Sequence, residues 1–258
     1  ITYHRTDSTR VSDVGLRVAR EWISENIGEE ECAPKRWGEG GAHECIRPTR
    51  PVDARTLLKL VREGTYRLPQ KLTRDHLSLY DLIFRRFMAS QMKPARVLRQ
   101  KALVKVGDIK VEVEGVVEVL EAGFSRVYPL RVSKMAKLEP GVYRVGRVDY
   151  YRASDVSLYS EGDVVELMRK KEIGRPSTYA TILTTLLKRG YVRKNEKGQL
   201  VPTPLGFKVN WFLRRNYEAL VSEERTRYLE RLMREIEEGK SNYQEVLSEL
   251  YREVVSLR

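Results

Sequence analysis

A change in the spacing of apolar residues near residue 100 constrains the fold more than any other feature of this chain. Before it, as over residues 73–92, apolar side chains recur every three to four positions, which is typical of amphipathic helices. Residues 101–121 instead alternate apolar with polar side chains, and Gly107-Asp108 in their middle favours a hairpin turn. The helical spacing returns after residue 160. A chain that changes from helix to strand and back predicts an α+β fold of two or three domains.

Two capping residues mark the starts of the longer helices expected in the first part of the chain. Ser12 should cap a helix with Val14, Val18, Trp22 and Ile23 on its buried side, and Thr73 should cap a second one. The helices expected are 12–26, 53–63, 73–92, 177–190, 204–219, 222–238 and 241–257.

Further alternation follows the predicted hairpin. It predicts strands at 126–132 and 142–152, so that about 93–158 should be an all-β unit. Later, a helix that ends at Gly190 is followed by a basic hairpin over residues 191–201. A helix followed by such a hairpin has the outline of a winged helix.

The charge of the chain is concentrated in its middle. The formal net charge is +12, but residues 51–217 carry +16, whereas 1–50 and 218–258 are slightly negative. A basic region in a chain with a pI near 9.6 favours a polyanion such as nucleic acid as partner. The alternative is a surface kept soluble by charge, since 33% of the residues are charged. That share is also typical of thermophile proteins.

Several features bear on the cellular compartment. No apolar run reaches the ~18 residues that a membrane helix needs, and the first residues do not resemble a signal peptide, so we expect a cytoplasmic protein without a membrane partner. The start at Ile1 rather than Met favours a fragment, a processed product or half of a split protein.

Cys32, Cys45 and His43 offer only three metal ligands at poor spacing. A disulfide between the cysteines would fit a hyperthermophile, and free thiols would fit the cytosol.

Tyr3, Arg5 and Asp7 form the first candidate site. In an extended segment or tight turn, residues two apart point the same way, which would bring a phenol, a guanidinium and a carboxylate to one surface. The guanidinium could hold a phosphate while the phenol attacks the phosphorus. The alternative is a buried tyrosine beside a surface turn.

His43 and Arg47 lie in a second run, His-Glu-Cys-Ile-Arg-Pro-Thr. Histidine is the side chain suited to hold or move protons near neutral pH, and an arginine four residues later would add a phosphate contact. A capped loop with a surface histidine is the simpler interpretation of His43 alone.

A third run, Ile-Gly-Arg-Pro-Ser-Thr-Tyr-Ala, covers residues 173–180. Proline fits the first turn of a helix, where free N–H groups bind anions. Arg175, Ser177 and Thr178 would add side-chain donors to the same phosphate. On its own, the run is explained more simply as a capped amphipathic helix.

Taken together, these runs resemble the type IA DNA topoisomerase family. That family has a tyrosine motif, a His-Glu-Ala-Ile-Arg-Pro-Thr segment and an Ile-Gly-Arg-Pro-Ser-Thr-Tyr-Ala motif, and they follow one another in this order. Cys45 stands where the family has alanine, a change between small side chains. Residues 79–92 resemble the helix that leaves the family's tyrosine domain, and 199–206 resemble the segment after its winged helix. The resemblance extends to about residue 250.

The resemblance implies an α+β multidomain fold in three parts. These are a helical tyrosine nucleophile domain (1–92), a β-rich hinge or arch (93–160) and a helical, winged-helix-containing DNA-binding base (161–258). The arrangement would be the type IA topoisomerase toroid without its metal-binding domain.

The resemblance also implies roles for the candidate residues. Tyr3 would form a 5′-phosphotyrosyl bond with a cleaved DNA strand, and Asp7 would pair with His43. The catalytic residues expected are Tyr3, Arg5, Asp7 and His43, and the residues expected to contact DNA are Arg47, Arg175, Ser177 and Thr178.

Within the family, His4 and residues 225–228 are most similar to the topoisomerase half of reverse gyrase. The acidic domain that binds Mg²⁺ and the helicase-like half that uses ATP are not found in these residues. We therefore expect metal ligands and ATP coupling to come from other parts, in trans or in the intact polypeptide. The DNA partners expected are single-stranded and underwound double-stranded DNA.

Two other functions compete with strand cleavage. A non-catalytic winged-helix protein, such as a transcription or chromatin factor, would also explain the basic middle of the chain. A tyrosine recombinase is a weaker match, because its tyrosine would lie near the C-terminus, after the catalytic Arg and His residues.

Overall fold

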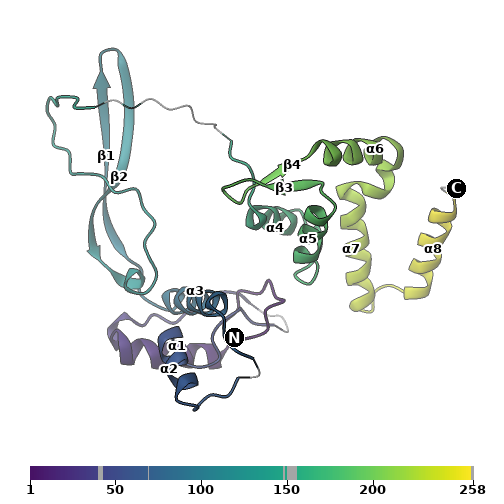
Figure 1. Ribbon diagram of the computed structural model, residues 1–258, viewed down its shortest axis with the longest axis horizontal. Coiled ribbons are helices and arrows are strands. Elements are labelled where there is room, and N and C mark those ends of the chain that lie inside the picture. The colour runs from purple at the N-terminus through teal and green to yellow at the C-terminus, as the bar shows by residue number, and fades with distance from the viewer. Residues whose placement is uncertain (40–42, 69, 148, 150–155, 257–258) are drawn as a thin grey trace. The chain divides into compact units, whose positions relative to one another are not determined.

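The computed structural model describes residues 1–39, 43–68, 70–147, 149 and 156–256. The chain divides into two compact units, residues 1–148 and 149–258, and each combines helices with a β-hairpin (Figure 1). This mixture of helix and sheet is consistent with the predicted α+β class. The three domain boundaries expected from the sequence remain predictions. No helix in the described part of the chain has the length and apolar character needed to cross a membrane.

The first unit begins with a helical part. Its elements are α1 (Asp13–Asn26), a 3-10 turn (Glu29–Glu31), α2 (Ala54–Arg62) and α3 (Arg74–Ser90). The predicted caps of α1 and α3 are confirmed: the Ser12 side chain accepts the N–H of Gly15, and Thr73 and His76 form a reciprocal capping box.

The core of the first unit lies between α1 and α3. Ile23, Phe84 and Met88 are almost completely buried, and the edge of the Trp22 ring packs on Phe84 with centroids 5.0 Å apart. The prediction that Val14 belongs to this core is wrong, because its side chain is 46% exposed. The predictions for Val18 and Ile23 are confirmed, and Gly15 and Ala19 complete the buried side of α1, so that the helix approaches its neighbours through two of its smallest residues.

The predicted hairpin forms β1 (Arg96–Val106) and β2 (Ile109–Glu121), which pair antiparallel. Val106 pairs with Ile109 across the two-residue turn, where Gly107 has a φ of 60°. The base of the hairpin is fixed to the helical part: Phe124 donates its N–H to the Lys93 carbonyl at 2.9 Å, and Val127 joins the core.

The two further strands predicted in this region are not found. Residues 126–132 and 142–147 form no strand, and 148 and 150–152 of the second prediction lie outside the described residues. Val116 makes only an isolated bridge with Lys134. Alternation requires a partner strand and a covering layer to become a sheet, whereas Val142 is fully exposed here.

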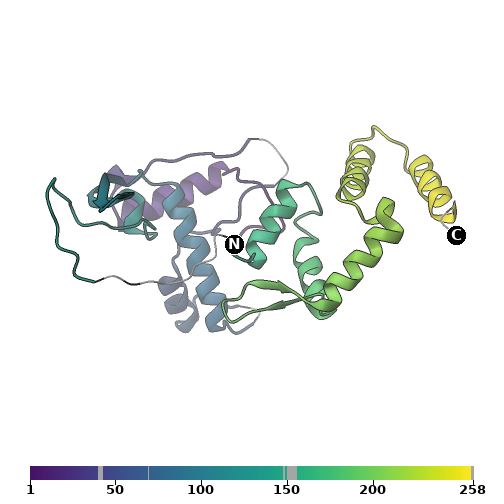
Figure 2. The same ribbon diagram turned by 90° about the horizontal axis from the view of Figure 1, so that it is seen from above.

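The second unit contains five helices and a short hairpin within its described residues. They are α4 (Glu161–Lys170), α5 (Tyr179–Lys188), β3 (Val192–Lys194), β4 (Leu200–Pro202), α6 (Pro204–Val221), α7 (Glu223–Glu237) and α8 (Tyr243–Ser256). The helix and basic hairpin expected from the sequence are present, with Asn195 donating its N–H to the Gln199 carbonyl at 2.9 Å across the turn. In both views α6 leads directly out of this hairpin (Figure 1 and Figure 2).

Candidate active site

The segment before Tyr3 is held by backbone and hydroxyl contacts to residues 43–48, which we call the 43–48 strap. Thr2 donates its N–H to the Arg47 carbonyl at 2.9 Å, and its hydroxyl accepts the Arg47 N–H at 2.9 Å and donates to the Cys45 carbonyl at 2.8 Å. Because its neighbour Thr2 is fixed in this way, Tyr3 is positioned although its own side chain is 54% exposed. The alternative of a buried tyrosine is therefore wrong.

The Tyr3 ring lies beside two histidines. Its centroid is 5.3 Å from that of His43 and 5.7 Å from that of His4. Arg5 and Asp7 are exposed, and the described residues include no hydrogen bond or ion pair between Asp7 and His43. The structure thus brings Tyr3 and His43 together, while the expected pairing of Asp7 with His43 is not formed.

Arg47 is buried and forms an ion pair with Glu44. Nε of Arg47 donates to Oε2 of Glu44 at 2.9 Å and Nη2 donates to Oε1 at 2.7 Å, while Nη1 donates to the Pro48 carbonyl at 2.9 Å. Ser12 Oγ donates to Oε2 of Glu44 at 2.6 Å, which links the cap of α1 to the strap. The predicted phosphate contact of Arg47 would therefore require this pair to break.

The electrostatics of Glu44 reflect these bonds. Partial burial acts to raise its pKa, but hydrogen bonds from Arg47 and Ser12 and the charge of Arg47 outweigh burial, and the pKa lies below its usual value. Gly15 makes the arrangement possible, since a Cβ there would lie 2.8 Å from Nε of Arg47. The run from Val11 to Gly15 therefore has a structural role beneath the strap.

The third predicted run lies in the second unit, and its arginine is held by α7. Nε of Arg175 donates to Glu230 and Nη1 donates to Glu237, both at 2.8 Å. These hydrogen bonds raise the pKa of Arg175, so it stays cationic. The backbone N–H of Arg175 donates to the Thr178 hydroxyl at 2.9 Å, and the Ser177 side chain is exposed. The run thus places an arginine and two hydroxyl side chains on one tight turn before α5, where the guanidinium and the Thr178 hydroxyl already have partners within the unit.

Cys32 and Cys45 are free thiols in the structure, so the disulfide considered above is not formed. Burial raises the pKa of both thiols, with Glu44 adding to the rise at Cys45. Three or more metal-ligating side chains do not come together among the described residues.

Thr2 and Glu44 hold the 43–48 strap in place, and the sequence did not single them out. Glu44 lies inside the recognised second run, and a carboxylate three residues before an arginine is a signal for a local ion pair. Thr2 carried no such signal, because its partners are 43 and 45 residues away.

Comparison with known proteins covers nearly the whole chain. A profile of the DNA topoisomerase family matches residues 1–248. Reverse gyrase of Pyrococcus furiosus is 54% identical over 98% of this chain, and that of Methanocaldococcus jannaschii is 46% identical over 100%. The match covers 21% and 16% of those relatives. The chain thus spans about a fifth of the curated relatives it matches.

A solved structure agrees with these relatives. Full-length topoisomerase I from Thermotoga maritima is 33% identical, with a TM-score of 0.69. The similarity covers 99% of this chain and 42% of that one.

Proposed function

The chain belongs to the type IA DNA topoisomerase family, and we propose that it is the part of a reverse gyrase-like enzyme that carries the nucleophile. Tyr3 is the proposed nucleophile for cleavage and resealing of one DNA strand. The observation that carries this proposal is the clamping of Thr2 by the 43–48 strap, which leaves the Tyr3 ring exposed beside His43.

The proposed reaction is a transesterification. The phenolic oxygen of Tyr3 bonds to the phosphorus as the bond from phosphorus to the 3′ oxygen breaks, and the proton of the phenol ends on that oxygen. The product is a 5′-phosphotyrosyl bond and a free 3′-hydroxyl, and resealing is the reverse. The bond energy is kept, so this step needs no ATP.

The neighbours of Tyr3 suit the demands of this step. A phenol with a pKa of about 10 is mostly protonated at neutral pH, so it needs nearby groups that accept its proton and stabilise developing charge. We assign the proton to His43 and the phosphoryl charge to Arg5, which is exposed three positions from the clamped Thr2. Asp7, which makes no pair with His43 within the described part of this structure, is proposed to pair with it in the complex with DNA.

The strand itself would be held by the third run. We propose that Ser177 and Thr178 contact DNA phosphates, and that Arg175 joins them when a phosphate displaces it from Glu230 and Glu237. Arg47, also predicted for this role, would have to leave Glu44, so we propose that it acts through the 43–48 strap.

Other requirements are proposed to be met outside this chain. The described residues do not form a site that fits Mg²⁺, so its ligands would belong to a metal-binding part, and ATP would be used by a helicase-like part. These parts would act in trans or within one polypeptide, on single-stranded and underwound DNA.

The test is a covalent adduct of defined polarity. Single-stranded DNA labelled at either end is incubated with the chain, a metal-binding part of the family and Mg²⁺, and stopped with detergent. The 3′ label should migrate with the protein and the 5′ label should be released. Tyr3→Phe should abolish the adduct and keep DNA affinity, whereas Tyr251→Phe should cleave normally.

Two results would contradict the proposal. An adduct that survives in Tyr3→Phe would place the nucleophile elsewhere. Tight DNA binding without any adduct would favour a non-catalytic winged-helix protein.

A further inference from the structure

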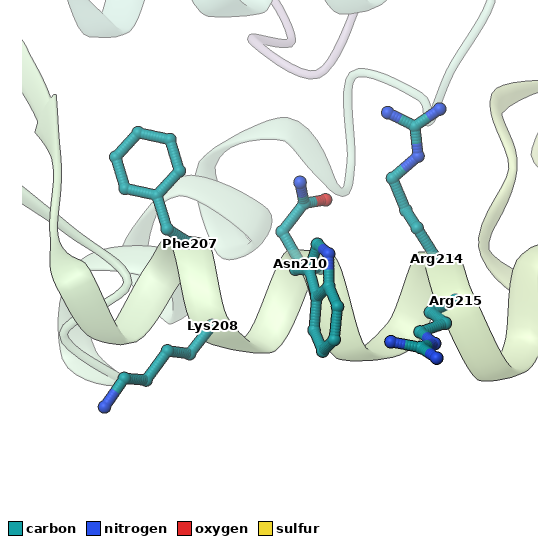
Figure 3. A pocket seen from close by; sticks show the side chains of 6 residues that line it. Phe207, Lys208, Asn210, Arg214 and Arg215 are labelled. Atoms are coloured by element: carbon teal, nitrogen blue, oxygen red, sulfur yellow. The ribbon is translucent and has the colours of Figure 1, made fainter.

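The outward side of α6 carries aromatic and basic side chains that strand cleavage at Tyr3 does not use. This surface, which we call the α6 face, is formed by Phe207, Lys208, Asn210, Trp211, Arg214 and Arg215, which line a hollow of about 770 Å³. Figure 3 shows Phe207 and Arg214 toward one edge of this stretch of helix and Lys208 and Arg215 toward the other. All six side chains are exposed.

The rings of the α6 face are not needed to pack α6 on its own unit. At 100° per residue, the less exposed Gly206, Val209 and Leu213 lie on the opposite side of the helix from Phe207 and Trp211. A Cβ at Gly206 would lie 2.1 Å from a backbone carbonyl oxygen, which marks the inward side. Phe207 and Trp211 nevertheless remain 64% and 61% exposed. Two large rings, one helical turn apart, are therefore available to a ligand.

The charged side chains of the α6 face itself are all cations, whereas Asn210 and Arg214 also border a second hollow that Glu218, Glu223 and Glu224 line. Between Glu196 and Glu218 the sequence has no acidic residue, and the cations of the α6 face fall within this stretch. The guanidinium of Arg215 lies over the Trp211 ring, 5.1 Å from its centroid. A cation fixed on a ring next to exposed rings is complementary to an anionic ligand that also offers flat apolar surfaces.

We propose that the α6 face binds single-stranded DNA, with bases stacked on Phe207 and Trp211 and phosphates held by the three cations. Unpaired bases can leave their own stack to meet a ring, whereas duplex bases cannot do so cheaply. The nine residues from Phe207 to Arg215 rise about 12 Å along the helix, so the α6 face can follow a short stretch of a strand. The inference rests on the proposed function, since it takes a DNA strand as the ligand.

The first test compares two double variants of the full chain, each lacking one exposed ring and one exposed arginine. Trp211→Ala with Arg215→Gln alters the α6 face, and Tyr251→Ala with Arg252→Gln alters α8 in the same unit. Binding to a labelled 15-mer of thymidine is followed by fluorescence anisotropy at several salt concentrations. We expect the α6 variant to lose about tenfold or more in affinity, and its salt slope to fall by about 0.7. The α8 variant should bind like the wild type.

The second test reads the contact without disturbing the fold. Stacking on a base should quench Trp211, one of three tryptophans in the chain. Trp211→Phe keeps a ring, so it should bind the 15-mer with nearly unchanged affinity but lose the DNA-dependent quenching. Quenching that persists in Trp211→Phe, or equal affinity of the α6 and α8 variants, would overturn the proposal and indicate that the face serves another partner.

These results are separable from those on Tyr3. Loss of binding at the α6 face without any covalent adduct would refute cleavage and keep the α6 site. A covalent adduct at Tyr3, together with wild-type DNA affinity in the α6 variant, would support cleavage and refute the α6 site.

Discussion

Glu44→Gln should destabilise the first unit strongly, because it leaves the Arg47 charge buried without its counter-charge. The Arg47 side chain is 4% exposed, and two of its nitrogens bond to the Glu44 carboxylate. Removing one partner of a buried pair costs about 3–5 kcal/mol. The Glu44 side chain is 22% exposed and glutamine keeps one hydrogen-bond acceptor, so we expect a loss of stability at the low end of this range, about 3 kcal/mol. Such a loss makes the ratio of folded to unfolded protein roughly a hundredfold smaller.

The assay is urea unfolding at pH 7, followed by tryptophan fluorescence in a Trp211→Phe background so that the signal comes from the first unit. Asp13→Asn is the matched control, since it makes the same change in an ion pair with Arg36 whose side chains are 61% and 83% exposed. The free energy of unfolding of the Asp13→Asn control should fall by less than about 1 kcal/mol. Equal losses in the two variants would refute the argument from burial.

The pH dependence follows from the lowered pKa of Glu44. A carboxylate whose pKa is lower in the folded state stabilises the fold above its unfolded value, about 4.3, and that contribution is lost as the pH falls through the folded value. The difference in free energy of unfolding between the wild type and Glu44→Gln should therefore be largest near neutral pH and should shrink as the pH falls into the acid range. A difference that stays constant from pH 7 down to pH 3 would contradict the assigned cause.

Three further predictions concern other parts of the chain. Gly206→Ala should cost the second unit about 3 kcal/mol in urea unfolding, because its Cβ would meet the rigid Tyr191 carbonyl oxygen at 2.1 Å; an unchanged midpoint would contradict this. Tyr80→Phe should cost about 1 kcal/mol through loss of a hydrogen bond to a backbone carbonyl. Burial first, then nearby acidic groups, raises the pKa of Tyr80 to about 12, so its stabilisation should be complete below pH ~10 and disappear as the pH rises to about 12. Glu230→Gln removes one of the two carboxylate charges that hold Arg175, so Arg175 should be more available to a phosphate and the affinity for single-stranded DNA should rise severalfold by anisotropy; an unchanged affinity would argue against a DNA contact there.

Local signals in the sequence predicted most helices well. The caps at Ser12 and Thr73 and the hairpin turn at Gly107 were identified because each depends on residues within one turn of the chain. The strands predicted at 126–132 and 142–152 had the right alternation but lacked a partner, and alternation alone cannot supply one.

The candidate site was predicted in part. The sequence runs singled out Tyr3 and His43, which the structure brings to a centroid distance of 5.3 Å. The same runs did not reveal that Arg47 is buried, because its burial depends on Glu44 and on the space left by Gly15 under α1.

The sequence by itself determined most of the helices (α4 excepted), both hairpins, the family and the identity of the candidate nucleophile, because these follow from short-range spacing and from ordered motifs. The tertiary structure alone decided that Arg47 is buried and that Arg175 is held by a distant helix. Glu44, three residues before Arg47, signals a local ion pair but not its burial, and Glu230, which holds Arg175, lies 55 residues further along the chain. Burial and long-range pairing depend on the whole packed chain, so no local pattern encodes them.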